Sequence, residues 1–574
     1  MSPSAVVDAK PESAREVAPG KPESGAIDRY SHVEGWLHDH LNVVALAVIA
    51  AGFVVRVLVA SRSYLNPDEA LHYLLLNQSS ISLAYKASLS NAHPPLIYLV
   101  VYFWHFLGRS ELMLRLPSVL AGTAFCWFVF KWVGIVFGRA ASAISLVMAA
   151  FSPALIALSA QLREYALLLF GIAAALYFLE RAFQEKSVRG MWYFSIFLYF
   201  AILSHYSAAF FVLAIGLYSV ARIVDSQLPR KVVAVWAGGQ VGALAIYGFL
   251  YFTQISKIKN SIPVWGMPFD GSYYHLDREN IITFTAERTS KIFEFMFSQE
   301  YIAQAILLFF VVSVAVLIVR DLVFRRGGPP CSHSGILLLL PFVAVWGAAI
   351  AGIYPYSGSR HTVFLAPFAI AAAGFLLAAV YGQKLWASLL IAALLMGASN
   401  ASGRTFEPYI KKEDQRRTLM VAAMNEIRQS VPRSDLVLAD FQSSFAIAYY
   451  LCGPRDIVEF VRFRGEFNEF NCGGHSIIFP SYHVWKLTSG NFLSEFEKMS
   501  HTFGLKPGDR VWVFQYGWGA NLDKGLPAYL PKFRCLAPKR FGDNLTVIPF
   551  VVDPVLSPAT PATNCAPPAF NSLM

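Results

Sequence analysis

Asp68 and Glu69 are adjacent carboxylates that directly follow the first long apolar run of the chain. Charge close to lipid is costly, so ionisable residues at such a place are candidates for function. Pro67 can begin a helix, and both carboxylates would then lie in its first turn, where the helix dipole stabilises anions. By itself, the pattern is more often an ordinary helix start than an active site.

Four further ionisable clusters weaken the ordinary explanation, because each of them also borders an apolar run. They are His93-Pro94-Pro95, Arg163-Glu164-Tyr165, Ser204-His205-Tyr206 and Ser359-Arg360-His361. A carboxylate can take the proton of an acceptor hydroxyl that attacks the anomeric carbon of a sugar. Arginine and histidine can neutralise a phosphate leaving group, arginine with two parallel hydrogen bonds. At the depth of a membrane, these residue types together indicate glycosyl transfer from a polyprenyl-phosphate sugar.

The elements that must hold these clusters are membrane-spanning helices. Of the 574 residues, 56% are hydrophobic and only 15% are charged, whereas about a quarter of a soluble domain is charged. A crossing of the bilayer core takes about 20 apolar residues. Runs of this kind predict an α-helical polytopic membrane protein with about eleven transmembrane helices, at residues 41–60, 116–137, 140–160, 166–182, 190–204, 207–222, 232–252, 301–320, 335–353, 361–381 and 385–399.

The short loops that carry lysine and arginine all fall on one side of the membrane when the N-terminus is placed in the cytoplasm. Such loops are typical of the cytoplasmic face, so topology accounts for the net charge of +10 and no nucleic-acid partner is needed. This orientation requires that residues 93–107 do not cross, and we expect them to lie at the outer interface. All five ionisable clusters then lie on the extracytoplasmic surface.

The composition divides the chain into three parts. Residues 1–40 are predicted to be a disordered cytoplasmic tail, and residues 41–400 a transmembrane domain with outer loops at 61–115 and 253–300. Residues 401–574 are predicted to be an extracytoplasmic α/β domain. In this last part, apolar periodicity predicts strands at 436–439, 511–514 and 547–552 and helices at 412–430 and 491–501.

Four cysteines lie in the predicted outer domain, namely Cys452, Cys472, Cys535 and Cys565. In an oxidising compartment they can form two disulfides, with three alternative pairings. The chain has no Cys-x-x-Cys and no cluster of His and Cys at zinc spacing, so these cysteines do not predict a metal site.

Taken in order, five short motifs resemble those of the GT-C glycosyltransferases. They are Asp68-Glu69-Ala, His93-Pro-Pro-Leu, Leu114-Arg115-Leu-Pro117-Ser, Arg163-x-Tyr165-Ala and Ser-Arg360-His361. The similarity covers residues 40 to 400 and is to the branch that holds protein O-mannosyltransferases, lipid A aminoarabinose transferases and rhizobial galacturonosyltransferases. The chain departs from the family at Gln161, where members often carry Glu, which leaves open whether Glu164 takes a second acidic role.

The resemblance implies an enzyme that moves a sugar, with inversion at the anomeric carbon, from polyprenyl phosphate to a hydroxyl of a lipid, polysaccharide or protein. In that family an outer-loop aspartate acts on the acceptor and basic residues hold the lipid phosphate. Asp68 is therefore the candidate catalytic base, with Glu69 beside it. The candidate residues for the donor phosphate and substrate are His93, Arg163, Glu164, Tyr165, His205, Arg360 and His361.

The expected partners are the lipid bilayer, the polyprenyl-phosphate sugar and the lipid, glycan or protein acceptor. No residue is assigned to a metal, and a divalent cation is left open as a cofactor. The expected location is the plasma membrane of a bacterium, with the site and the C-terminal domain on the extracytoplasmic face.

A polytopic transporter or lipid flippase is the main alternative, and a non-catalytic scaffold with the same fold is a third reading. A transporter would also use carboxylates and histidines, but nearer the midplane and often in helices broken by Gly or Pro. The clusters here lie at helix ends and outer loops, which favours the enzyme. Among single residues, Arg115 is expected to anchor a helix start and Arg56 to extend to the interface, whereas His205 is explained equally well by helix-end packing or by the site.

Overall fold

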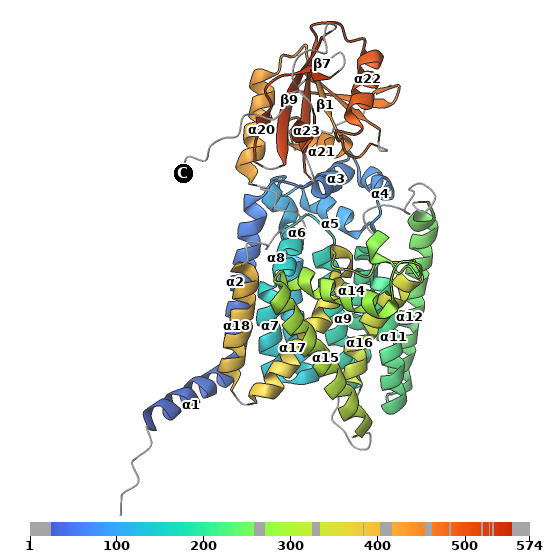
Figure 1. The fold of residues 1–574 in the computed structure, drawn as a ribbon. Coiled ribbons are helices and arrows are strands. Elements are labelled where there is room, and N and C mark those ends of the chain that lie inside the picture. Colours follow the sequence, from blue (N-terminus) through green and yellow to red (C-terminus); the bar gives the residue numbers. More distant parts are fainter. Residues whose placement is uncertain are drawn as a thin grey trace, which may run out of the picture.

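The computed structural model describes residues 24–257, 270–323, 333–382, 384–401, 416–453, 462–481, 484–517, 521–526, 529–530, 533–542 and 544–553. Long helices run side by side over most of the chain, and a β-sheet with covering helices lies beyond one end of this bundle (Figure 1). The helices that precede the sheet are α1 (Ser24–Asp39), α2 (Leu41–Arg62), α3 (Pro67–Leu76), α4 (Ile81–Ser88), α5 (Leu96–Trp104), α6 (Glu111–Phe137), α7 (Arg139–Phe151), α8 (Pro153–Ser159), α9 (Tyr165–Glu185), α10 (Val188–Ser204), α11 (Ala208–Asp225), α12 (Arg230–Leu250), η1 (Tyr251–Ile255), η2 (Asp270–Ser272), α14 (Ile281–Phe297), α15 (Glu300–Val323), α16 (Ser334–Ile350), η3 (Arg360–Leu365), α17 (Ala366–Tyr381) and α18 (Leu385–Ala401).

Each of the predicted spans corresponds to helical structure. Among the described residues, seven helices are long and apolar enough to cross a membrane, and the bent pair α7–α8 makes an eighth. The apolar helices α10, α16 and α18 have 17 residues each, so a count of eleven crossings stays a prediction. With only 9 residues, α5 is too short to cross, since a crossing takes about 20.

The predicted span at 140–160 is wrong in one respect, because two helices meet there at an angle of 58°. Pro153 begins α8 and has no N–H, so the carbonyl oxygen of Ala149 lacks its donor within the helix. Arg56 replaces it, donating to Ala149 at 3.2 Å and to the carbonyl of Ala150 at 2.9 Å. Arg56 is only 1% exposed, so the expectation that it extends to the interface is wrong. The bend leads the chain into the polar turn before α9.

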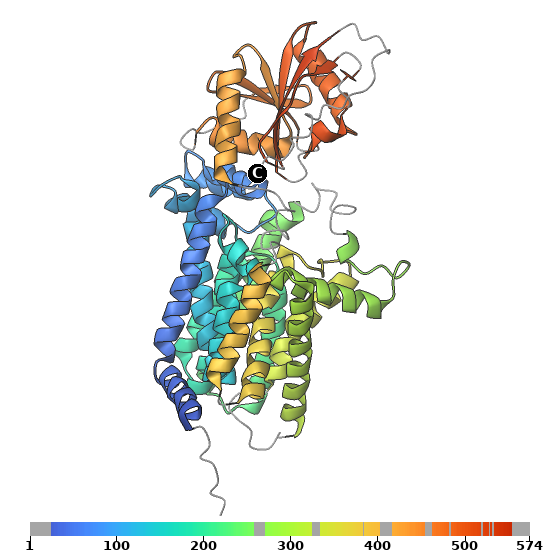
Figure 2. The same ribbon diagram turned by 60° about the vertical axis from the view of Figure 1, so that its left-hand side comes forward.

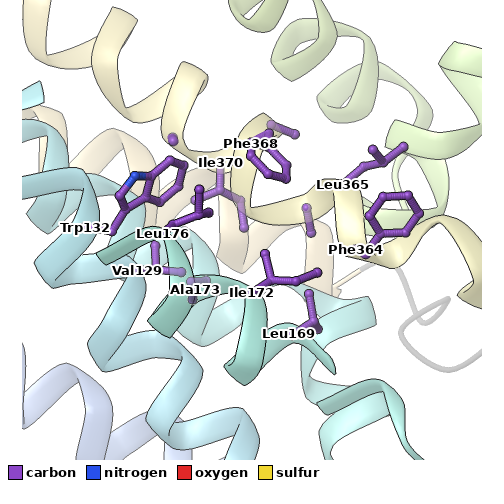
Figure 3. Close-up of a cluster of buried hydrophobic side chains, with 14 of the residues drawn as sticks. Val129, Trp132, Leu169, Ile172, Ala173, Leu176, Phe364, Leu365, Phe368 and Ile370 are labelled. Carbon is purple, nitrogen blue, oxygen red and sulfur yellow. The ribbon is translucent and has the colours of Figure 1, made fainter. Parts of the chain in front are cut away.

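Helices α6, α9 and α17 pack against one another through a fully buried apolar core (Figure 3). Trp132 of α6 lies edge-on to Phe368 of α17, with 5.9 Å between ring centres. Because α9 begins at Tyr165 and η3 begins at Arg360, this core also fixes the distance between two of the predicted polar clusters.

The loop between α2 and α6 folds into the short helices α3, α4 and α5. Asn66 caps α3: its side-chain oxygen accepts the N–H of Glu69, whose carboxylate accepts the N–H of Asn66, both at 3.0 Å. Pro67 is the first helical residue. This reciprocal capping box confirms the predicted helix start and places Asp68 and Glu69 in the first turn.

The C-terminal region forms an α/β structure, as predicted. Its helices are α20 (Arg417–Ser430), α21 (Phe441–Tyr450), α22 (Phe492–Phe503) and α23 (Leu522–Gly525). Its strands are β1 (Leu436–Ala439), β2 (Arg462–Arg464), β3 (Phe467–Cys472), β4 (His475–Pro480), β5 (Arg510–Tyr516), β6 (Tyr529–Leu530), β7 (Phe533–Cys535), β8 (Lys539–Arg540) and β9 (Leu545–Val552). The strand order is β2-β3-β4-β1-β5-β9-β7-β6, with β8 paired to β9.

Strand β1 is parallel to both of its neighbours, β4 and β5, with Leu436 opposite Ser476 and Val511. The other described pairs are antiparallel. Helices α20 and α22 cover opposite faces of the sheet (Figures 1 and 2). Alternation along β1 matches this arrangement, because Val437 packs with the α20 side and Leu438 with the α22 side.

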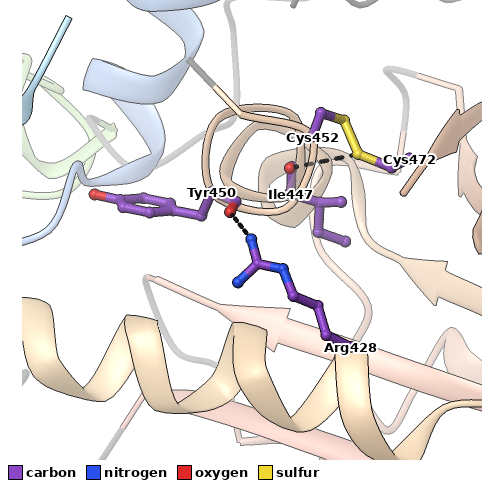
Figure 4. Close-up of a disulfide and its surroundings, with 5 residues drawn as sticks. All are labelled: Arg428, Ile447, Tyr450, Cys452 and Cys472. Carbon is purple, nitrogen blue, oxygen red and sulfur yellow. Dashed lines mark hydrogen bonds between the residues drawn. A yellow bond between two sulfur atoms is a disulfide. The ribbon is translucent and has the colours of Figure 1, made fainter. Parts of the chain in front are cut away.

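Helix α21 packs on α3 and so joins the sheet to the loop that carries Asp68. Tyr449 of α21 lies edge-on to Tyr73 of α3, with ring centres 4.8 Å apart. A disulfide between Cys452 and Cys472 and a hydrogen bond of 2.7 Å from Arg428 to the carbonyl of Tyr450 secure the end of α21 (Figure 4). The disulfide between Cys452 and Cys472 selects one of the three predicted cysteine pairings.

Cys535 is also disulfide-bonded, and Cys565 lies outside the described residues. Part of the predicted disordered tail is helical, because residues 24–39 form α1. Glu34 of α1 accepts the N–H of Leu385 at 2.7 Å and so caps the start of α18. Residues 1–23 of the predicted tail lie outside the described part of the chain.

Candidate active site

Asp68 meets two arginines that come from distant parts of the chain. Its Oδ2 atom forms ion pairs with Nη1 of Arg163, in the turn before α9, and with Nη1 of Arg360, at 2.6 Å. Burial alone would raise the pKa of Asp68, but the two guanidinium groups outweigh it and lower this pKa to about 2. Asp68 is therefore ionised at neutral pH, and it is a weak base as long as both arginines hold it.

Glu69, the next residue, has a different set of partners. Arg115 donates to both of its oxygens, at 2.7 and 2.8 Å. The N–H groups of Leu162 and Asn66 add one hydrogen bond to each oxygen. Glu69 is fully buried, and its oxygens are occupied by groups that hold the loop together. These contacts favour a positioning role for Glu69, and its predicted catalytic role stays a prediction.

Arg115 ties the start of α6 to the end of α2, which agrees with its expected role as an anchor. Its Nη1 and Nη2 atoms also donate to backbone carbonyl oxygens, at 2.7 to 2.8 Å, of Ala60, Ser63 and Tyr64. Arg115 is 1% exposed. Its hydrogen bonds therefore hold the loop from the protein interior, where a substrate does not reach them.

Glu164 is a second buried carboxylate of the site and binds two imidazoles. Its Oε2 lies 3.1 Å from Nε2 of His72, and its Oε1 lies 3.2 Å from Nδ1 of His93. Nη2 of Arg163 lies 3.4 Å from the same Oε1. Burial would raise the pKa of Glu164, but Arg163 and the two histidines hold it well below its usual range. Glu164 therefore remains ionised.

The charged neighbours of His93 indicate which ring nitrogen carries its proton. Its Nδ1 faces the Glu164 carboxylate, which only accepts, and its Nε2 lies 3.3 Å from Arg163, which only donates. His93 therefore carries its proton on Nδ1 and accepts at Nε2. Burial lowers the pKa of His93, which keeps the ring neutral.

His72 connects the first turn of α3 to Glu164. Its Nδ1 lies 2.7 Å from the carbonyl oxygen of Asp68, and its Nε2 lies 3.1 Å from Glu164. The two guanidinium groups of Arg163 and Arg360 face the carboxylates of this cluster. A phosphate that reaches the arginines can therefore compete with Asp68 for them.

Four histidine rings follow one another across the site. The distances between neighbouring ring centres are 5.7 Å from His72 to His93, 5.5 Å from His93 to His205 and 6.1 Å from His205 to His361. Tyr165 lies 5.3 Å from His205. Burial lowers the pKa of His205 to about 4, so this ring is neutral. Its Nδ1 accepts the N–H of Ser207 at 3.1 Å, so its proton lies on Nε2, which can donate a hydrogen bond to a sugar hydroxyl.

His93, Glu164 and His205 offer ligand atoms that all lie within 4.8 Å of one another. These ligand types fit a divalent transition metal. However, Arg163 lies 3.3 Å from His93 and 3.4 Å from Glu164, and its positive charge opposes a second cation at that point. A metal at this cluster would require Arg163 to move away.

The structure brings together eight of the residues that the sequence singled out, namely Asp68, His93, Arg163, Glu164, Tyr165, His205, Arg360 and His361. Sequence reasoning missed His72 and Tyr98, whose rings stack at 4.9 Å and whose Nε2 and hydroxyl lie 3.2 Å apart. His72 follows Asp68 by one helical turn, and this spacing was the available signal. No signal pointed to Tyr98.

Residues 92–252, which include the His93 and Arg163 motifs, match the family described as dolichyl-phosphate-mannose-protein mannosyltransferase. The fold is similar to that of ArnT from Cupriavidus metallidurans bound to undecaprenyl phosphate, with a TM-score of 0.51 and 13% identity. That match covers 90% of this chain and 99% of the other. The chain therefore has the fold of this ArnT structure, and its residues 92–252 resemble the mannosyltransferase family.

ArnT from the same organism in the apo state matches this chain with a TM-score of 0.52 and 11% identity, over 90% of this chain and 98% of the other. An oligosaccharyltransferase from Archaeoglobus fulgidus matches at 11% identity with a TM-score of 0.48, over 83% and 69% of the two chains. No curated protein matches the chain by sequence. The predicted resemblance to the GT-C glycosyltransferases is supported by the partial family match and by the fold.

Proposed function

We propose that this protein transfers a sugar from a polyprenyl-phosphate donor to a hydroxyl group of an acceptor, with inversion at the anomeric carbon. The observation that carries the proposal is the convergence of Arg163 and Arg360 on Asp68 at the end of the apolar bundle. The likeness to ArnT bound to undecaprenyl phosphate supports a polyprenyl phosphate as the lipid part of the donor.

Two guanidinium groups that meet at one oxygen form an anion-binding site. In this structure the carboxylate of Asp68 occupies that site. A phosphate diester or monoester of the donor can also bind these guanidinium groups. The Arg360 side chain is 28% exposed, so it can turn toward an incoming phosphate.

Competition for the arginines would activate Asp68. When the donor phosphate binds Arg163 and Arg360, the two cations that hold the pKa of Asp68 at about 2 are neutralised. This pKa then rises toward its ordinary value, and the carboxylate becomes a better base. Donor binding thus makes Asp68 more basic before it takes the proton of the acceptor.

The transfer step follows from these positions. The acceptor oxygen attacks the anomeric carbon, its proton passes to the Asp68 carboxylate, and the bond from the anomeric carbon to the phosphate oxygen breaks. The lipid phosphate leaves as an anion that Arg163 and Arg360 stabilise. Attack on the side opposite to the phosphate inverts the configuration.

The neighbouring residues hold Arg163 in place for this step. Its Nη2 atom lies 3.3 Å from both His93 and the Tyr165 hydroxyl and 3.4 Å from Glu164. One edge of the guanidinium is therefore fixed, and the other edge is directed at Asp68. His205 and His361 lie further along the row of rings and are assigned to the sugar or the acceptor.

We place the reaction on the extracytoplasmic face of a bacterial plasma membrane, since the basic short loops predict that orientation. The acceptor is a lipid, polysaccharide or protein hydroxyl, and a divalent cation is not assigned a role.

The test uses the full chain reconstituted in proteoliposomes with a panel of radiolabelled polyprenyl-phosphate sugars and membrane-extracted acceptors. We expect label to appear in an acceptor with wild-type protein and not with Asp68→Asn. A wild-type protein that transfers no sugar from any donor, yet exchanges solute across the vesicles by counterflow, would establish the transporter alternative.

A further inference from the structure

A cavity lies outside the Asp68 cluster, where the helical bundle meets the C-terminal region. Its volume is about 570 Å³, within the range of small-ligand sites in proteins. Its walls are the chain segment from His105 to Glu111, Arg417 and Val421 of α20, and Tyr449 and Tyr450 of α21. Both halves of the molecule therefore contribute to it.

The cavity lies at the level of a membrane surface. Glu111 is the first residue of α6, one of the helices long and apolar enough to cross. Phe106 and Leu107 line the cavity and are 67% and 66% exposed, and nearby Phe103 is 62% exposed. Large apolar side chains exposed beside the end of a span are typical of contact with lipid chains.

The charged groups of the cavity have both signs. Arg109 and Arg417 line it together with Glu111, and Nε of Arg417 lies 3.0 Å from a Glu111 oxygen. The Glu111 side chain is 3% exposed and that of Arg417 is 53% exposed. A buried carboxylate is retained only with a cationic partner. The rings of Tyr449 and Tyr450 add faces that can attract an ammonium group.

We propose that this cavity binds the headgroup of a zwitterionic phospholipid. Its phosphate binds the guanidinium groups of Arg109 and Arg417, its ammonium binds the Glu111 carboxylate, and its chains lie over Phe106 and Leu107. A purely anionic lipid matches the arginines but has no cationic group for Glu111. The mixed charge of the cavity therefore selects a headgroup that carries both signs.

This lipid is separate from the sugar transfer and does not depend on the proposed reaction. Helix α3 lies between the cavity and the Asp68 cluster, since its Tyr73 packs on Tyr449 while its His72 binds Glu164. A headgroup in the cavity bridges α6, α20 and α21, so it stabilises the junction on which α3 rests.

The experiment is native mass spectrometry of the full chain after exchange into detergent with equal amounts of phosphatidylethanolamine and phosphatidylglycerol. Wild-type protein is expected to retain phosphatidylethanolamine about tenfold more, the ratio of one charge-assisted hydrogen bond. Glu111→Gln should abolish this preference, and Arg417→Gln should reduce the retention of both lipids. Arg181→Gln, which removes an exposed arginine paired with Glu185 on α9, is the matched control and should behave like wild type.

Equal retention of the two lipids by wild-type protein would overturn the proposal, and so would an unchanged preference in Glu111→Gln. Preferential retention of an added polyprenyl phosphate at this cavity would also overturn it, because that lipid has no ammonium. Arg109→Gln leaves the pair of Glu111 with Arg417 intact, so its expected loss of retention of both lipids remains informative if Glu111→Gln does not fold. In addition, phosphatidylethanolamine should raise the thermal midpoint of wild-type protein but not that of Arg417→Gln.

Discussion

Asp68 and Glu69 are neighbours in one turn of α3, yet they belong to two regions of different character. The Glu69 region is closed: each carboxylate oxygen accepts two hydrogen bonds, from Arg115 and from backbone N–H groups. In the Asp68 region, a carboxylate that is 13% exposed shares one oxygen between two arginines from separate elements. The first arrangement cannot change without unfolding the loop, whereas a competing anion can rearrange the second.

This contrast indicates that two adjacent carboxylates have different roles. Glu69 and Arg115 fix the turn, so that Asp68 is held at the meeting point of α3, α9 and η3. In the proposed function, a substrate phosphate replaces Asp68 on its two arginines. The predictions below test whether these roles can be separated.

Asp68→Asn is expected to have the largest effect on transfer. It removes the proton acceptor, and such a loss costs about 10²- to 10⁴-fold in kcat. The measurement is single-turnover transfer with reconstituted protein. Glu185→Gln, which alters an exposed carboxylate paired with Arg181 at the end of α9, is the control and should keep the wild-type rate. A wild-type rate in Asp68→Asn would remove Asp68 from the chemistry.

Glu69→Gln is expected to act on stability. It leaves Arg115 buried without its counter-charge, and breaking such a pair costs about 3–5 kcal/mol. The thermal midpoint in detergent should fall strongly, while the fraction that remains folded should keep most of its kcat. A stable but inactive Glu69→Gln variant would contradict the division of roles and return Glu69 to the catalytic group.

Arg360→Gln should weaken the interaction with the donor phosphate. Loss of one charge-assisted hydrogen bond costs about 1.5–3 kcal/mol, or about 10- to 150-fold in affinity. We expect the KM for the donor to rise by this factor, with the KM for the acceptor unchanged. Arg288→Gln, on α14 and paired with Glu279, is the matched control. An effect on the acceptor KM alone would place Arg360 elsewhere in the reaction.

The smallest expected effect is on the pH dependence of stability and involves His205. Its pKa is about 4 in the folded protein and about 6.5 when unfolded. As the pH falls from about 6.5 to 4, the unfolded chain therefore binds a proton that the folded chain does not, and stability is lost. His205→Asn should lessen this fall of the thermal midpoint by a few degrees. Identical profiles for the two proteins would show that His205 does not titrate in this way.

Much of the site could be predicted because topology alone decides which helix ends share a membrane surface. The apolar runs predicted the spans, and counting crossings brought Asp68, Arg163 and Arg360 to one surface before any contact was known. The helix start at Pro67 could also be predicted, because Asn66 and Glu69 cap α3 through a local interaction.

The remaining features depend on contacts between distant segments. Glu69 could not be separated from Asp68, because its partner Arg115 is 46 residues away. Likewise, the role of Arg56 depends on carbonyl oxygens of a helix 93 and 94 residues further along the chain. His72 was missed as a site residue because its value lies in the pairing with Glu164, which only the packed structure reveals.

Centrally, the Asp68 carboxylate is proposed to occupy the site on Arg163 and Arg360 where the donor phosphate binds. The most direct measurement is the affinity of wild-type protein and Asp68→Asn for polyprenyl phosphate, by titration in detergent with Arg360→Gln alongside. Because Asp68→Asn removes the competing anion, the account predicts about tenfold tighter binding in this variant, although its transfer activity is lost. Unchanged or weaker binding in Asp68→Asn would contradict the claim.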